Sequence, residues 1–388
     1  MTTRSVRLAV SLVLSAVGRK TRKSLWLCWL LWGGGWALAE TSLPEEIRPY
    51  FTAPAEWKGK TDGRRSPLLF SDGRRVSTEQ EWRQRREEIR QTWMNYMGAW
   101  PALLTQPRLE RGTTVQREQV RQIEVIVELA TNDFHRALLL IPDGAGPFPA
   151  VVVPFYDPET SVGQGARPLR DFGYQLAKRG FVTLSLGSPG GDARKPTTGR
   201  IDWQPLSYLA YLAANAHTVL AQLPEVDAAR IGIVGHSYGG KWAMFAACFY
   251  DKFACGVWSD PGIAFTENRV SVNYWEPWYL GQDEKRQRAP GLPTAENPRT
   301  GAYARLVEAN HDLHEVQALM APRPFLVSGG AEDPPRRWLT LNHSVEVNAV
   351  LGLTARVAMT NRPLHDPSEE SNEVIYQFLE HFLRAPAR

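Results

Sequence analysis

The chain has 388 residues, of which 43% are hydrophobic and 22% are charged. These fractions are typical of a soluble globular protein that buries a sizeable core. The formal net charge is +4, but residues 1–39 contribute six basic and no acidic side chains, so the rest of the chain carries −2. That balance excludes a nucleic-acid partner recognised through a basic surface.

Residues 1–39 are expected to be a signal peptide. Basic residues precede an apolar stretch at 25–39, which ends in Ala37-Leu38-Ala39. A basic segment, an apolar segment and an A-x-A cleavage pattern are typical of a secretory signal. An uncleaved membrane anchor is the alternative, although the stretch is short for a span. We therefore expect a secreted or periplasmic protein that has no membrane contact after signal cleavage.

Residues 40–121 are expected to form an N-terminal arm and a helix packed on the main domain. The arm is rich in proline, glycine and basic residues. Ser77-Thr78 followed by Glu81 resembles a capping box and predicts the start of the helix, which Pro101 ends.

Residues 122–388 alternate eight apolar runs with helical segments. Most of the runs are continuous rather than alternating, which is typical of strands buried on both faces, and the intervening helices predict a mostly parallel α/β sheet. Thr131-Asn132-Asp133 supplies the turn of a hairpin between the first two runs. The stretch 263–310 breaks the alternation and is expected to be a lid-like insertion after the sixth strand. The expected strands are "IEVIVEL", "ALLLIP", "PAVVVPFY", "FVTLSLG", "RIGIVG", "ACGVWSD", "PFLVSGG" and "TARVAMT". The expected helices are 171–179, 205–223, 241–250, 313–320, 338–351 and 369–383.

The stretch "VGHSYGGKW" points to a nucleophilic serine. Ser237 lies in a G-x-S-x-G pattern between an expected strand and an expected helix. A sharp strand-to-helix turn needs glycines and exposes the hydroxyl, which becomes a nucleophile when a base takes its proton. The pattern and its context resemble an α/β-hydrolase, whose catalytic residues follow the chain order serine, acid, histidine. The resemblance implies that His365, after the last strand, is the base.

Two aspartates are candidates for the acid that orients His365. Asp333, in "GGAED" after the seventh strand, matches the G-x-x-D turn of the fold and is favoured. Asp260, in "SDP" after the sixth strand, is the alternative, and Glu332 is a more distant one. Either turn can deliver a buried carboxylate to the histidine.

Backbone N–H groups are expected to bind the oxyanion. The resemblance places one at Tyr238, directly after the nucleophile, and the other at Phe155 or Tyr156, after the "PAVVVPFY" strand.

Two further stretches resemble secreted glucuronoyl esterases. "SYGGK" is similar to the S-R-x-G-K run of that family, and "DLHEVQALMAPRP" is similar to its D-Q-H-E-L-x-A-L-I-A-P-R-P stretch. The likeness implies a carbohydrate esterase acting on plant cell-wall polysaccharide, with Lys241 as a substrate-binding residue. Many members of that family carry the acid on the turn after the sixth strand, which keeps Asp260 a candidate. The arginine that follows the serine in that family is replaced by Tyr238 here. A tyrosine offers no positive charge to a glucuronate group, so acetyl esters fit as well as glucuronoyl esters. Neither a cofactor nor a metal ion is expected, because a serine hydrolase needs none.

Two aromatic residues of the insertion, Trp275 and Trp278, are candidates for stacking on a sugar ring, although packing of the loop against the body is the alternative. Cys248 and Cys255 are expected to be buried free thiols, with a disulfide as the alternative.

The predicted function is a serine carboxylesterase that acts through an acyl-enzyme on a polysaccharide-linked ester. The alternatives are a serine peptidase of the prolyl-oligopeptidase kind and a non-catalytic glycan-binding protein of the hydrolase fold. The segment before the first expected strand is too short for the propeller domain that such peptidases usually carry.

Overall fold

The structure, a computed structural model, describes residues 43–192, 203–269, 274, 279–286 and 288–384. The expected signal peptide at 1–39 lies outside these residues, as do Trp275 and Trp278. Within the described part of the chain, every helix is too short or too polar to serve as a membrane span.

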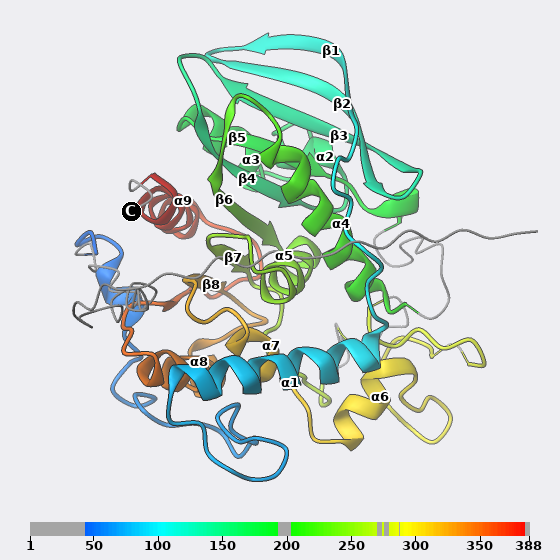
Figure 1. Cartoon of the computed structure of the whole chain (residues 1–388), viewed down its shortest axis with the longest axis vertical. Helices are drawn as coiled ribbons and strands as arrows, with labels where there is room; N and C mark the ends of the chain where they lie inside the picture. Colours follow the sequence, from blue (N-terminus) through cyan, green and yellow to red (C-terminus); the bar gives the residue numbers. More distant parts are fainter. Residues whose placement is uncertain (1–42, 193–202, 270–273, 275–278, 287, 385–388) are drawn as a thin grey trace, which may run out of the picture. The chain divides into compact units, whose positions relative to one another are not determined.

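The described strands form one nine-stranded sheet with flanking helices (Figure 1). The strands are β1 (Leu109–Arg117), β2 (Val120–Ala130), β3 (Asp133–Pro142), β4 (Phe148–Pro154), β5 (Val182–Leu186), β6 (Val226–His236), β7 (Gly256–Ser259), β8 (Phe325–Gly329) and β9 (Val357–Asn361). The helices are α1 (Glu79–Met97), α2 (Pro158–Ser161), α3 (Phe172–Lys178), α4 (Pro205–Ala221), α5 (Tyr238–Phe249), α6 (Gly301–Glu308), α7 (Leu313–Ala318), α8 (Trp338–Val350) and α9 (Glu369–Arg384). Short 3-10 segments lie at Arg48–Phe51, Pro189–Gly191 and Pro335–Arg337.

The strand order is β1-β2-β3-β5-β4-β6-β7-β8-β9, and the part from β5 to β9 is parallel. The carboxyl ends of these strands therefore meet at one edge, where the loops after β6, β7, β8 and β9 lie in succession. This arrangement confirms the predicted fold class. The expected hairpin is β2–β3, and Asn132 takes the positive φ of 58° in its turn.

The eight expected strands correspond to β2 through β9, whereas β1 was missed. Every residue of β1 is exposed or half-buried, because this strand lies at the sheet edge and pairs only with β2. It therefore lacks both the apolar run and the alternation by which a strand is recognised.

The parallel strands are buried on both faces, which explains their continuous apolar runs. In β4, Val151 and Val153 belong to a core cluster with residues of α3 and α9. Ala150 and Val152 point the other way, into the larger core cluster that contains residues of α4 and α5.

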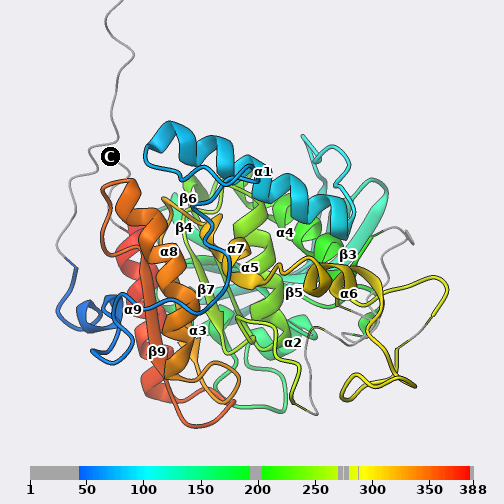
Figure 2. The same ribbon diagram turned by 90° about the horizontal axis from the view of Figure 1, so that it is seen from below.

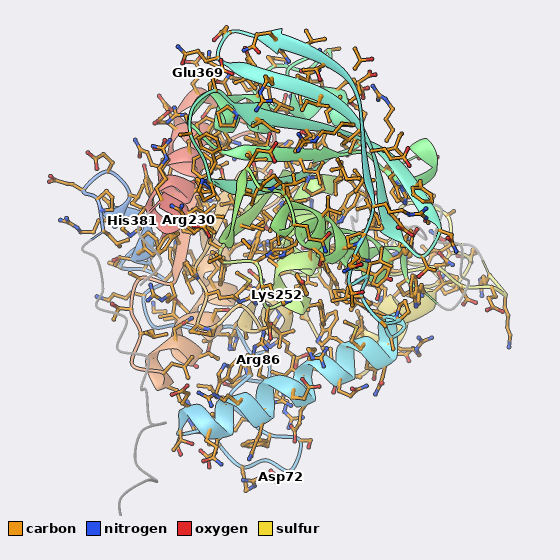
Figure 3. All side chains as sticks on the ribbon, turned by 45° about the horizontal axis from the view of Figure 1, so that its top comes forward. Asp72, Arg86, Arg230, Lys252, Glu369 and His381 are labelled. Carbon is orange, nitrogen blue, oxygen red and sulfur yellow. The ribbon has the colours of Figure 1, made fainter. Side chains whose placement is uncertain are left out.

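Helix α1 begins at the expected capping box and covers the helical layer. The Thr78 side chain accepts from the Glu81 backbone N–H, and Glu81 reaches back to the Thr78 N–H. The helix contacts α4, α6 and α7, and Figure 2 shows it lying across them. Arg86, labelled in Figure 3, donates from Nη1 to Asp251 Oδ2 at 3.0 Å, beyond the end of α5.

Cys248 on α5 and Cys255 just before β7 are buried free thiols, as expected. Burial raises the pKa of both thiols.

Candidate active site

Ser237 lies on a strained turn between β6 and α5. Its backbone has φ 54° and ψ −115°, a conformation that side-chain-bearing residues rarely adopt outside functional sites. The turn is tight: a Cβ atom on Gly235 would lie 2.1 Å from Gly239 O, and one on Gly239 would lie 2.1 Å from Pro154 O. The two glycines of the pattern are thus required by backbone approach, and the serine side chain is held out at the sheet edge.

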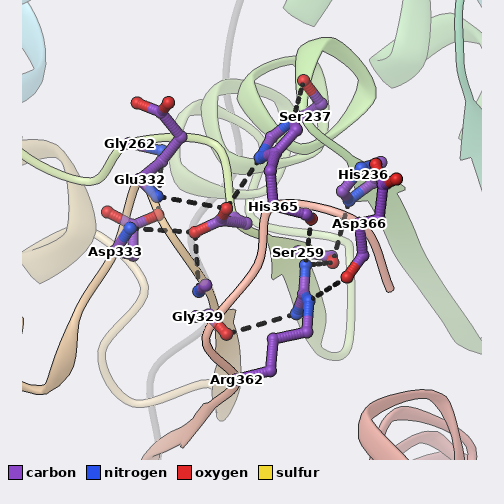
Figure 4. Close-up of polar contacts among 12 residues, drawn as sticks. His236, Ser237, Ser259, Gly262, Gly329, Glu332, Asp333, Arg362, His365 and Asp366 are labelled. Carbon is purple, nitrogen blue, oxygen red and sulfur yellow. Dashed lines mark hydrogen bonds and ion pairs between the residues drawn. The ribbon is translucent and has the colours of Figure 1, made fainter. Parts of the chain in front are cut away.

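A continuous hydrogen-bond chain joins Ser237, His365 and Asp260 (Figure 4). Ser237 Oγ lies 2.9 Å from His365 Nε2. His365 Nδ1 lies 2.7 Å from Asp260 Oδ2. An ionised carboxylate can only accept a hydrogen bond, so Nδ1 donates to Asp260 and Nε2 of the neutral imidazole is left to accept from the serine hydroxyl.

Asp260 is fully buried, and backbone N–H groups of the loop after β8 surround its carboxylate. Oδ1 accepts from Gly330 N at 2.7 Å and from Asp333 N at 2.8 Å. Oδ2 accepts from Glu332 N at 3.2 Å as well as from His365. These bonds fix the direction of the carboxylate toward the imidazole.

The preference for Asp333 as the partner of His365 was wrong: the structure places Asp260 there. The Asp333 carboxylate points instead into the loop after β7, where it accepts from Gly262 N at 2.8 Å and Ile263 N at 2.7 Å. Arg337 Nε lies 3.4 Å from its Oδ1. Burial raises the pKa of Asp333 to about 6. Glu332, the more distant candidate, forms a two-bond ion pair with Arg269.

The structure narrows the candidates for the two backbone N–H groups of the expected oxyanion site. Tyr238 is the first residue of α5, and the first N–H groups of a helix have no intrahelical acceptor. Of the two candidates after β4, Phe155 is excluded, because its N–H already donates to Leu186 O at 3.0 Å. The Tyr156 N–H makes no hydrogen bond to the described part of the chain, so Tyr156 is the candidate that the geometry leaves.

The Tyr238 side chain is buried rather than directed to solvent. Its hydroxyl lies 3.1 Å from Ser188 Oγ, and burial raises its pKa. Its ring centroid lies 5.1 Å from that of Tyr156 and 6.0 Å from that of Tyr279. The position directly after the nucleophile thus carries a neutral aromatic group.

Lys241 lies one turn into α5 and is buried beneath the insertion. Its Nζ lies 5.4 Å from the ring centroid of Tyr274 and 5.6 Å from that of Tyr279, within reach of cation–π attraction. Both tyrosines are buried. These two rings pack the insertion onto α5.

Sequence reasoning missed the polar groups beneath His365. His236, the residue before the nucleophile, is buried, and its ring centroid lies 4.8 Å from that of His365. Its Nδ1 lies 3.1 Å from Ser259 Oγ, which also accepts from Arg362 Nη2 at 3.2 Å. Burial holds the pKa of His236 well below its usual value. A lone serine and an arginine in a loop gave no pattern that could have identified them.

Part of the chain matches a known protein family. Residues 212–334 match the prolyl oligopeptidase family, and this segment includes Ser237 and Asp260 but ends before His365. A search of curated proteins found no match.

Several solved structures are similar over most of the chain. A glucuronoyl esterase from Solibacter usitatus superposes with a TM-score of 0.62 and 19% sequence identity, over 81% of this chain and 96% of that one. A promiscuous esterase of carbohydrate esterase family 15 from a marine bacterial metagenome gives a TM-score of 0.64 and 16% identity, over 88% and 98% of the two chains. A proposed acetyl xylan esterase from Bacteroides fragilis gives a TM-score of 0.53 and 16% identity, over 82% and 86%. At these identities the likeness establishes the α/β-hydrolase fold.

Proposed function

We propose that the protein is a secreted serine carboxylesterase whose catalytic residues are Ser237, His365 and Asp260. The observation that carries this proposal is the hydrogen-bond chain from the Ser237 hydroxyl through His365 to the buried Asp260 carboxylate. A serine, an imidazole and a carboxylate in this order form the arrangement that activates a serine for acyl transfer.

In the proposed reaction, Ser237 Oγ attacks the ester carbonyl while His365 Nε2 takes the hydroxyl proton. The backbone N–H groups of Tyr238 and Tyr156 stabilise the oxyanion of the tetrahedral intermediate. His365 then gives the proton to the leaving alcohol, and an acyl-enzyme remains on Ser237. Water, deprotonated by the same imidazole, releases the carboxylic acid and restores the serine.

The names of similar solved structures support a proposal for the substrate class. The similar structures include glucuronoyl esterases and a proposed acetyl xylan esterase. We infer an ester on a plant cell-wall polysaccharide, carrying an acetyl or a glucuronoyl group. Lys241 is buried against Tyr274 and Tyr279, so it is not retained as a contact to the sugar. Residues 1–39 are the proposed export signal.

A small substrate panel tests the proposal: an aryl acetate, acetylated xylan, a benzyl glucuronoyl ester and an aminoacyl arylamide. Wild type is compared with Ser237→Ala. Ser344→Ala on α8 is the control, because this serine is buried and its Oγ makes no hydrogen bond to the described part of the chain. We expect wild type and the control to cleave at least one saccharide ester, and Ser237→Ala to lose that activity. If neither wild type nor Ser237→Ala cleaved any substrate of the panel, the proposal would be wrong.

A serine peptidase is the second candidate, because residues 212–334 match the prolyl oligopeptidase family. The same catalytic residues would then cleave an amide. Turnover of the arylamide alone would favour this candidate.

A further inference from the structure

His365 lies on an exposed loop that must hold the imidazole in register with two partners. The loop follows β9, and the side chains on either side of the histidine, Leu364 and Asp366, are 68% and 70% exposed. The bonds to Ser237 and Asp260 orient the imidazole ring but do not fix the backbone that carries it. Another group has to supply that restraint.

The Arg362 guanidinium is bonded to the backbone of this loop (Figure 4). Its Nη2 donates to the carbonyl oxygen of His365 at 2.8 Å, and its Nε donates to the carbonyl oxygen of Asp366 at 2.7 Å. The side chain therefore folds back onto the two peptide groups that directly follow the base in the chain.

The other donors of Arg362 reach the ends of two neighbouring strands. Nη1 donates to Ser328 O at 2.9 Å and to Gly329 O at 3.2 Å, at the end of β8. Nη2 also donates to Ser259 Oγ at 3.2 Å, at the end of β7 and next to Asp260. One planar group thus ties the loop after β9 to β7 and β8.

The bonds at Ser259 continue to the underside of the imidazole. Ser259 Oγ lies 3.1 Å from Nδ1 of the buried His236, whose ring lies against that of His365 at a centroid separation of 4.8 Å. Arg362 therefore restrains His365 in two ways: directly at its backbone carbonyl, and through Ser259 and His236 at one face of its ring.

The acceptors suit arginine and exclude a simple replacement by lysine. Arg362 donates to carbonyl and hydroxyl oxygens on opposite sides, which requires the rigid, multi-donor fork of a guanidinium. Burial lowers its pKa, while the charges of Asp260 and Asp333 act in the opposite direction. A lysine ammonium would be a point charge able to satisfy one side only.

We propose that Arg362 is a positioning residue, whose guanidinium fixes the His365 backbone against the ends of β7 and β8 so that the imidazole meets Ser237 and Asp260 together. The inference rests on the function proposed above. Arg362 does not touch the reacting atoms, so its removal should slow the chemical step and leave substrate binding unchanged.

The test compares Arg362→Lys and Arg362→Ala with wild type on whichever ester the wild-type protein cleaves. A misplacement of about 1 Å in a catalytic group costs about 10²-fold in rate, so we expect kcat to fall by about that factor and KM to stay unchanged. Added millimolar guanidinium should raise kcat of Arg362→Ala in a concentration-dependent way. Sodium chloride at the same ionic strength should not.

Arg323→Lys is the matched control. Arg323 also donates to backbone carbonyls, those of Tyr250 and Phe253 at 3.1 and 3.0 Å, and its side chain is 13% exposed. It precedes β8, at the opposite end of the strand from the site. Its replacement should lower the melting temperature and leave kcat unchanged.

The outcomes separate this inference from the proposed function. If Arg362→Lys folds and keeps the wild-type kcat, the inference is wrong. It is also wrong if Arg323→Lys loses as much kcat as Arg362→Lys. In both cases an active wild-type protein would still support the esterase function. If the wild-type protein cleaved no ester, the result would contradict the proposed esterase function rather than the role of Arg362. Should neither Arg362 variant fold, Ser259→Ala removes one acceptor of the guanidinium: a smaller kcat loss at unchanged KM supports the inference, and unchanged kcat overturns it.

Discussion

The loops after β7 and β8 carry one buried aspartate each, and the two are held in nearly the same way. The carboxylate of Asp260 accepts backbone N–H groups from the loop after β8, and that of Asp333 accepts N–H groups from the loop after β7. They differ in their other neighbour: Asp260 meets His365, whereas Asp333 lies beside Arg337. Each aspartate thus accepts hydrogen bonds from the loop that carries the other, and these reciprocal bonds hold the two loops together. In the proposed site Asp260 orients His365, whereas Asp333 stabilises the loop that carries Asp260.

The largest effect is expected for Asp260→Asn. An asparagine can no longer hold the His365 tautomer that leaves Nε2 free to accept from Ser237, a change that costs about 10⁴-fold in kcat in serine hydrolases. The measurement is steady-state hydrolysis of an aryl acetate. If Asp333→Asn lost more kcat than Asp260→Asn, Asp333 rather than Asp260 would be the acid that orients His365.

Gly330→Ala should cost less but still act on Asp260. A Cβ atom there would lie 2.7 Å from Asp260 Oδ2 and 2.4 Å from Leu364 O, so both the acid and the histidine loop must shift. We expect a fall of about 10²-fold in kcat. Gly63→Ala, where nothing lies within 4 Å, is the control and should keep wild-type kcat. Equal activity of the two variants would show that this close contact does not restrain the acid.

Asp333→Asn should act on stability more than on catalysis. The amide keeps one acceptor oxygen and turns an NH₂ group toward a backbone N–H, and a buried polar group left unsatisfied costs about 1–3 kcal/mol. Urea unfolding should report a fall of that size in the free energy of unfolding, with kcat within a few-fold of wild type. A collapse of kcat in a folded variant would contradict the supporting role.

The same substitution should change how stability depends on pH. The pKa of Asp333 is about 6 in the folded chain, and an unfolded aspartate has a pKa of about 3.9. Between these values the folded state binds more protons, so the contribution of Asp333 to the free energy of unfolding falls as pH rises from about 4 to about 6. The free energy of unfolding of wild type minus that of Asp333→Asn should therefore fall across this range, whereas the buried histidines with lowered pKa values act alike in both proteins. Parallel profiles would contradict the raised pKa.

The smallest effect is expected for Glu332→Gln. The ion pair with Arg269 lies at the rim of the two loops, with side chains 15% and 36% exposed, and such pairs contribute about 0.5 kcal/mol. The backbone N–H that Glu332 gives to Asp260 is unaffected by the substitution. Unchanged kcat and a small shift in melting temperature would fit this account, while a large kcat loss would make Glu332 part of the site.

The sequence was sufficient for the features that depend on local pattern. Strands buried on both faces leave continuous apolar runs, so β2 through β9 were predicted, and the capping box predicted the start of α1. Ser237 was predicted from the tight G-x-S-x-G turn, and His365 from the resemblance to α/β-hydrolases, which places the base after the last strand.

The choice between Asp260 and Asp333 could not be made in that way. Both follow a parallel strand at the same edge of the sheet, and the outcome depends on how far the loop after β9 crosses the end of β8. Arg362 governs that crossing through contacts with Ser259 and Ser328, which are far apart in sequence and leave no periodic signal.

The most direct test of the central claim is the rate at which a fluorophosphonate labels Ser237, read by mass spectrometry. It is measured in wild type, Asp260→Asn and Asp333→Asn. The account predicts rapid labelling of Ser237 in wild type and in Asp333→Asn, and strongly slowed labelling in Asp260→Asn. Labelling at another residue, or slowing in Asp333→Asn alone, would contradict it.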